Sequence, residues 1–212
     1  MKKNITLALI LISLGSWAQN HQEIISVKLG YGSTNVIIKE ANSPDFNLFG
    51  YSFSSGNTFV GEGIEVGVSK SINPNLFIEL GFSDFKGGDL RYKVNSYERS
   101  YKLKGYQIPL SVNYLFRKEE KKLRFNLGAG LQYFKSTLSE FESYLNTENV
   151  YIENQAKDID ISEVHFLIRP GLQYRIVKHL TAAFVVKVSL SSNGRYTDNP
   201  AISLKYSFLK NN

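Results

Sequence analysis

The chain contains no cysteine among its 212 residues, and it has only five prolines, one tryptophan and one methionine. Without cysteine there are no disulfide cross-links, on which exported domains often depend. Anchoring as a lipoprotein through an N-terminal cysteine is excluded for the same reason. The stability of the fold must therefore come from a large core or from a closed, hydrogen-bonded sheet.

Long apolar runs are also missing after residue 18, where no stretch approaches the roughly 20 apolar residues that a membrane-spanning helix needs. The sequence therefore excludes a helical membrane protein. Charge is modest, with a formal net value of +6 to which Lys2 and Lys3 contribute two. Since the other positive charges are scattered along the chain, we expect no nucleic-acid partner.

Residues 1–18 have the pattern of a secretory signal peptide. Lys2 and Lys3 form a positive start, residues 5–14 are apolar, and Ser16 and Ala18 place small residues at the −3 and −1 positions of a cleavage site. The apolar stretch is too short to cross a bilayer. We expect residues 1–18 to be removed, which leaves one domain over residues 19–212.

The dominant pattern beyond the leader is alternation of apolar and polar residues, which is typical of β-strands with two unlike faces. Tyr106, Ile108 and Leu110 share one face of such a segment, whereas Gln107 and Ser111 share the other. The pattern recurs along the chain and predicts eight strands. Their expected ranges are 25–39, 57–70, 76–87, 97–117, 122–138, 159–175, 179–192 and 200–209.

The predicted connections alternate in length. Turns at 71–75, 117–121 and 176–178 are short, whereas the loops at 40–56, 88–96, 139–158 and 193–199 are longer. This layout is typical of an outer-membrane β-barrel, with its turns in the periplasm and its loops outside the cell. An even number of strands then places both termini in the periplasm. We therefore predict an all-β, eight-stranded antiparallel up-and-down transmembrane β-barrel in a Gram-negative outer membrane.

Two further features of the strands concern aromatic residues and prolines. Aromatic residues cluster at both ends of the apolar face, which predicts girdles at the two membrane interfaces. Pro109 and Pro170 fall inside predicted strands, where proline removes a hydrogen-bond donor from the ladder. We expect a bulge or a local break at each proline. The girdle residues are Tyr114, Phe116, Phe125, Tyr174, Tyr206 and Phe208 near the turns, and Phe82, Tyr106, Tyr133 and Phe166 near the loops.

Two segments resemble consecutive strands of a known family. Residues 105–110 read Gly-Tyr-Gln-Ile-Pro-Leu and residues 125–130 read Phe-Asn-Leu-Gly-Ala-Gly. Both are similar to the outer membrane β-barrel domain that is widespread in Bacteroidetes, the porin-like or PorT-like family, and residues 202–208 resemble its terminal strand. The resemblance implies that Tyr206 and Phe208 form a C-terminal signal for the barrel assembly machinery. Glu163, His165 and Arg169 depart from the pattern, because related chains often have aspartate and extra glycines there.

The polar face should point into the barrel, where it would carry a set of opposite charges. Arg169 and Lys187 are expected to face each other, because they are equally distant from the turn at 176–178. An eight-stranded barrel is narrow enough for side chains to fill it. We predict a lumenal charge network of Glu65, Glu79, Arg124, Arg169 and Lys187, with His165, Gln107 and Gln132 as polar neighbours. The alternative is that this network gates a path for ions or small solutes.

Residue types for catalysis or metal binding are sparse. The chain has three histidines, His21, His165 and His179, and no particular nucleophile accompanies any of them. His, Asp and Glu do not cluster at metal-ligand spacing. We therefore expect no enzymatic activity, no cofactor and no metal.

The expected function is that of an integral outer-membrane protein with a structural or surface-interaction role and a filled lumen. Its expected partners are outer-membrane lipid and lipopolysaccharide, together with the barrel assembly machinery during biogenesis, and we expect a monomer. Charged loops, acidic at 139–160 and basic at 86–99, would form either a solvated surface or an adhesive one. The alternatives are a narrow pore and a soluble periplasmic barrel of lipocalin type, in which the apolar face points inward.

Overall fold

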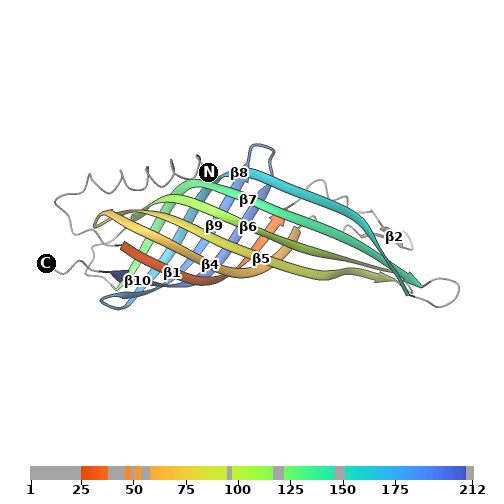
Figure 1. The fold of residues 1–212 in the computed structure, drawn as a ribbon, viewed down its shortest axis with the longest axis horizontal. Coiled ribbons are helices and arrows are strands. Elements are labelled where there is room, and N and C mark those ends of the chain that lie inside the picture. Colours follow the sequence, from red (N-terminus) through yellow and green to blue (C-terminus); the bar gives the residue numbers. More distant parts are fainter. Residues whose placement is uncertain are drawn as a thin grey trace, which may run out of the picture.

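A computed structural model of the chain describes residues 25–37, 46–48, 51–53, 58–94, 97–116, 122–145 and 151–208. The predicted signal peptide lies outside the described residues. These residues form ten strands, and eight of the ten form one long barrel (Figure 1). The barrel strands are β1 (Ile25–Ile37), β4 (Thr58–Asn73), β5 (Leu76–Val94), β6 (Tyr97–Leu115), β7 (Leu123–Leu145), β8 (Tyr151–Val177), β9 (Leu180–Ser191) and β10 (Tyr196–Phe208). The strands β2 (Phe46–Leu48) and β3 (Tyr51–Phe53) form a separate small hairpin.

The barrel closes because the first strand has two partners. Leu29 of β1 pairs with Leu204 of β10 on one side and with Val66 of β4 on the other, and both pairings are antiparallel. Every other barrel strand pairs with its neighbours in sequence. The predicted all-β, eight-stranded antiparallel up-and-down barrel is thereby confirmed. Among the described residues, no helix is long and apolar enough to span a membrane.

The strands β5, β7 and β8 are longer than predicted, with 19, 23 and 27 residues, whereas β6 has 19 residues and matches its predicted range to within two. The loops expected at 88–96 and 139–158 are therefore largely wrong, since Asp89 pairs with Tyr101 and Ser139 pairs with Asp158. Likewise, β10 already begins at Tyr196, within the loop expected at 193–199. In Figure 1 these four strands continue beyond the ends of β1 and β9 as a projecting sheet.

The prolines interrupt the ladder without a bulge. Pro109 pairs with Gln132 of β7, but its pairing with β5 is skipped and resumes in the same register. Pro170 pairs with Leu127 of β7 and loses its β9 partner in the same way. A missing amide donor explains why each proline loses one ladder and keeps the other. The expected local break is confirmed, whereas a bulge at these two positions is not found.

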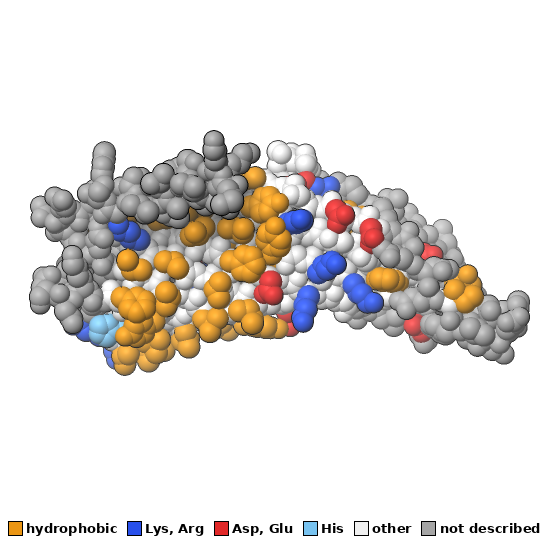
Figure 2. All heavy atoms as spheres, viewed as in Figure 1, with side chains coloured by type: hydrophobic (Ala, Val, Ile, Leu, Met, Phe, Trp, Pro, Cys, Tyr) orange, Lys and Arg blue, Asp and Glu red, His pale blue; other side chains and the backbone are white. Residues whose placement is uncertain are grey.

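The apolar face of the alternation points outward over most of the barrel. Leu131, Phe166 and Ile202 are 56%, 55% and 68% exposed, whereas the alternate residues point inward. On the face that Figure 2 shows, hydrophobic side chains gather over the part of the barrel at the left, and we call this outward apolar surface the apolar band. The predicted girdle residues border this band, and rings such as Phe116 and Phe125 are in contact, with centroids 5.4 Å apart. An exposed apolar band contradicts the lipocalin alternative, which needs this face inside.

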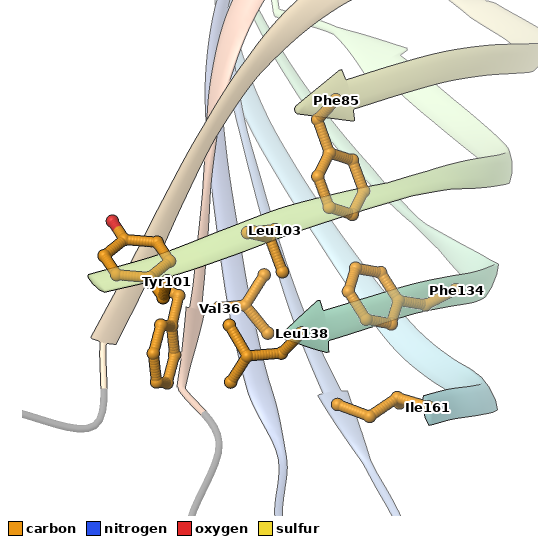
Figure 3. Packing of buried hydrophobic residues seen from close by; sticks show 8 residues of the cluster. Val36, Phe85, Tyr101, Leu103, Phe134, Leu138 and Ile161 are labelled. Carbon is orange, nitrogen blue, oxygen red and sulfur yellow. The ribbon is translucent and has the colours of Figure 1, made fainter. Parts of the chain in front are cut away.

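Polarity reverses where the projecting sheet begins. On β7, Tyr133 is the last apolar residue on the outward face of the band, and Lys135 follows it two positions later. The inward face becomes apolar over the same stretch, with Phe134 and Leu138 both at 0% exposure. The expectation of a polar inner face is therefore wrong at this end. Water replaces lipid outside, so the part of the barrel beyond the band packs like a soluble protein. Figure 3 shows this inward cluster of Val36, Phe59, Phe85, Tyr101, Leu103, Phe134, Leu138 and Ile161.

The position of the band can be tested with one substitution at two depths. Leu127 lies midway along the outward band of β7, whereas Leu123 lies at its turn end. We expect Leu127→Arg to lower the free energy of unfolding by about 2–4 kcal/mol and Leu123→Arg by about 0–1 kcal/mol, because the cost of a buried charge depends on depth. Urea unfolding in lipid vesicles measures both, and equal effects of the two variants would contradict this placement.

Candidate functional site

The centre of the lumen holds a compact cluster of buried charges. Glu65 of β4 and Glu79 of β5 each point inward, and the Nζ atom of Lys28 on β1 lies 2.6 Å and 2.5 Å from their respective Oε1 atoms. Arg169 of β8 places Nη2 2.7 Å from Glu79 Oε1, and Lys187 of β9 places Nζ 3.0 Å from Glu65 Oε1. Five strands thus contribute to one network, in which each carboxylate contacts two cations.

Strand register brings these groups together. Ile168 pairs with Val188 and Gly171 with Val185, so the Arg169 and Lys187 positions face each other as the turn-based estimate predicts. Such a pair of like charges is unfavourable alone. Here each cation contacts a carboxylate from across the lumen. Breaking one of these buried pairs would leave an uncompensated charge in a site without bulk water.

Sequence reasoning did not single out Lys28, although it lies on the correct face. Lys28 is 8% exposed and bridges the two glutamates, which are four residues apart in the β4–β5 register. Arg124, by contrast, is half-buried nearer the turn end of β7, where it pairs with Gln173. Lys205 also points inward, and its Nζ atom lies 4.4 Å from the centre of the Phe77 ring. A strand pattern shows which face a lysine occupies, but not which carboxylate it can reach across the bore.

A second group of polar residues lies beside the charge cluster. Gln132 Nε2 donates to Ser189 Oγ at 3.1 Å, and His165 Nδ1 lies 3.0 Å from the same oxygen. Ser189 also contacts Thr197 Oγ1 at 2.6 Å. Gln107 of β6 is buried on the same inward face, and its Nε2 donates to Thr34 Oγ1 of β1 at 3.2 Å. All three predicted polar neighbours, His165, Gln107 and Gln132, are 0% exposed.

His165 has neighbours that resemble a hydrolytic triad in composition. Its Nε2 atom lies 3.5 Å from Glu163 Oε2, and Ser189 is at its other nitrogen. Glu163 is itself engaged by Arg195. Ser189 is 1% exposed and already bonded to several side chains, so its hydroxyl is not presented to a substrate. Within the described part of the chain, no three His, Asp or Glu side chains are grouped to hold a metal ion.

An apolar layer covers the polar groups on the side of the projecting sheet. The Phe134 ring lies 5.2 Å from the His165 ring and 5.6 Å from the Phe85 ring, so it joins the two layers. Phe59 contacts Tyr101 edge to face at 5.0 Å. The lumen therefore changes along its axis from paired charges, through amides and hydroxyls, to aromatic and aliphatic side chains. The layer of aromatic and aliphatic side chains was not expected from the sequence.

The terminal aromatic residues lie on the outer surface at the opposite end. Tyr206 and Phe208 of β10 are 46% and 52% exposed, and their rings contact each other at 5.1 Å. His179, from the β8–β9 turn, stacks on Tyr206 with centroids 6.1 Å apart. This placement gives the closing strand an aromatic outer edge.

Comparisons with known proteins agree with this architecture. The model of the family described as outer membrane protein beta-barrel domain matches residues 5–208. The outer membrane protein OprG from Pseudomonas aeruginosa is similar in structure, with a TM-score of 0.53 and 12% identity over 90% of this chain and 98% of that one. Ail, the attachment invasion locus protein of Yersinia pestis, is similar with a TM-score of 0.51 and 12% identity, over 89% of this chain and 100% of that one. At these identities the likeness shows the fold alone, and no curated protein sequence matches.

The charge cluster should stabilise the barrel through balanced contacts. We expect Glu79→Gln to lower the free energy of unfolding by about 3–5 kcal/mol, because it leaves Lys28 and Arg169 short of a buried partner. Glu62→Gln is the matched control. Because Glu62 is exposed, this change should lower the free energy of unfolding by less than about 1 kcal/mol. Urea unfolding in vesicles compares the two variants, and a Glu79→Gln effect as small as the control would show that the cluster carries no net stabilisation.

Proposed function

We propose that this chain, which belongs to the family described as outer membrane protein beta-barrel domain, is a membrane anchor with a sealed lumen. The anchor would display a β-sheet at the cell surface. Family membership places the protein in the outer membrane. The observation that carries the rest is the combination of a filled lumen with four strands that extend past the apolar band. A protein that conducts ions or solutes would need an open lumen instead of a filled one.

Two layers of side chains support the sealed lumen. The charge cluster closes the part of the bore that lies within the apolar band, where Lys187 is 1% exposed and Glu65 is 3% exposed. The apolar cluster closes it again beyond the band, where Phe59 and Leu138 are fully buried. Ions would have to break paired charges in one layer and cross a dry region in the other, and both steps are costly.

The projecting sheet offers a surface for partners. From the β8–β9 turn, β8 pairs with β9 as far as His165, which pairs with Ser191. Beyond His165, β8 continues to Tyr151 and pairs with β7 on its other side. A strand with one described neighbour presents backbone groups that an extended segment of another protein can pair with. We propose surface interaction through this sheet as the function. Lipopolysaccharide around the barrel and the barrel assembly machinery during biogenesis are the other proposed partners.

The proposed orientation has the turns in the periplasm and the projecting sheet outside. In this orientation both termini are periplasmic, and Tyr206 and Phe208 lie where assembly of the closing strand begins. A monomer is sufficient, because the closed ladder leaves no strand edge within the apolar band.

Conductance measurements test the seal. In planar bilayers, the wild-type protein should give no channel steps above the baseline. The double variant Arg169→Gln/Lys187→Gln should also be silent, because the apolar layer still closes the lumen. Steady conductance of the wild type would favour the narrow pore, and conductance of the double variant alone would show that the charge cluster is the gate.

Epitope accessibility tests the orientation. A tag inserted between Leu145 and Tyr151 should be detected by antibody on intact cells, because these two residues form the last described pair at the far end of the projecting sheet. A tag added after Asn212 should be detected only after the outer membrane is permeabilised. The reverse pattern would contradict the proposed orientation.

A further inference from the structure

Positive charge exceeds negative charge in the part of the lumen that lies within the apolar band. Among the described residues there, the inward carboxylates are those of Glu65 and Glu79, and each already contacts two cations. The inward cations that face these two carboxylates are Lys28, Arg169, Lys187 and Lys205. Arg124 adds a further positive charge, but the excess is two charges even without it.

Lys205 of β10 is the cation that the charge cluster leaves without a carboxylate. It is the cross-strand partner of Lys28, and both side chains point inward, where like charges repel each other. Two carboxylates compensate Lys28, whereas among the described residues the Lys205 amino group contacts only the face of the Phe77 ring. A cation–π contact offsets part of the cost of desolvating an ammonium group, but the charge itself stays uncompensated.

The charges that act on the Lys205 amino group from farther away are mostly of its own sign. Glu79 is the one carboxylate among the strongest of them, and it is already in contact with Lys28 and Arg169. Lys28, Arg169 and Arg124 all oppose it. Charges inside a protein are screened less than those at its surface. The turn end of the lumen is therefore a region of positive potential.

A buried amide donor lies on the same part of the inward face. Asn126 of β7 is 0% exposed and is two residues from Arg124. Its Oδ1 atom accepts a hydrogen bond from Gln173 Nε2 at 3.3 Å, whereas its Nδ2 atom has no hydrogen-bond partner in the described part of the chain. A buried donor of this kind is usually satisfied by an ordered water or an ion. The donor and the excess positive charge both favour a negatively charged acceptor.

Access and size limit which anion can bind. Lys205 is half-buried, whereas Lys187, which belongs to the central charge cluster, is 1% exposed. An anion can therefore enter from the turn end and reach Lys205 without crossing the cluster. Side chains largely fill the bore of an eight-stranded barrel, which favours an anion of the size of chloride over phosphate.

We propose that the turn end of the lumen binds a small inorganic anion of the size of chloride, held by the Lys205 amino group on the side away from the Phe77 ring. The anion compensates positive charge that Glu65 and Glu79 leave over, and it stays bound in the lumen instead of passing through it. The proposal adds a ligand site to the sealed lumen. A failed seal would appear as conductance, whereas a failed anion site would appear in the stability measurements below.

Unfolding in defined salts tests whether chloride binds. Urea unfolding in lipid vesicles is measured at constant ionic strength with chloride replaced by methanesulfonate, so that charge screening is the same throughout. A ligand that binds only the folded protein raises the folding equilibrium constant by a factor of one plus the ratio of its concentration to its Kd. For a Kd of about 10 mM, about 200 mM chloride should therefore raise this constant about 20-fold.

Two matched lysine variants locate the effect. Lys205→Met removes the inward charge and keeps an unbranched side chain, whereas Lys122→Met removes an exposed charge at the same end of the barrel. The chloride dependence should be lost in Lys205→Met and kept in Lys122→Met. In methanesulfonate, Lys205→Met should be at least as stable as the wild type, because it removes an uncompensated charge. Heat-modifiable gel mobility confirms that each variant is folded.

Crystals of the wild type grown in bromide locate the anion directly, and an anomalous peak should lie in contact with Lys205 Nζ inside the bore. Phosphate at the same ionic strength should stabilise the protein less than chloride, and equal stabilisation would contradict a chloride-sized site. Glu119 and Glu120 lie outside the described residues, and a counter-charge from them would leave the wild type without chloride dependence. That result, equal chloride dependence in the two lysine variants, or bromide only on the outer surface would overturn the proposal.

Discussion

Closure of the sheet is the constraint on which the rest of the structure depends. Hydrocarbon offers no hydrogen bonds, so each backbone group within the membrane must pair inside the protein. Pairing of β1 with β10 satisfies this for eight strands and leaves a bore that side chains can fill. Charged residues that point into such a bore need opposite charges within contact, and Lys28, Glu65 and Glu79 have them across three strands. Pro109 and Pro170 each lose the pairing with one neighbouring strand and keep the pairing with β7.

The reversal of polarity along the strands divides the barrel into two zones. In the first zone the outside is apolar and the inside is charged, as lipid requires. In the second zone Lys104 and Lys135 point outward while Leu103 and Phe134 pack inside, as water requires. The same strands thus pass from a closed barrel with an apolar outer face to a projecting sheet with an apolar inner cluster. The apolar core of the second zone lets β5 to β8 extend far beyond the membrane.

The sequence predicts the first zone well, because apolar residues there always face outward and polar residues always face inward. Tyr106, Ile108 and Leu110 could be assigned to a face, and distance from a turn could place Arg169 opposite Lys187. It predicts the second zone poorly, because beyond Leu138 polar residues such as Ser139 and Glu140 stand on both faces of β7 and resemble a loop. Contacts across the bore, such as Lys28 with Glu79, depend on the stagger of the closed sheet, which no single strand encodes.

Polarity reverses between Tyr133 and Lys135 of β7, over a lumen that side chains fill. Since the chain has no cysteine, single cysteines can be placed at each position from 127 to 139 of β7 and tested for access to lipid-soluble and water-soluble reagents. We expect odd positions through 133 to react from lipid and those from 135 to react from water, while even positions are protected from both. Water access at positions 134 and 138, or lipid access at 135 and 137, would contradict it.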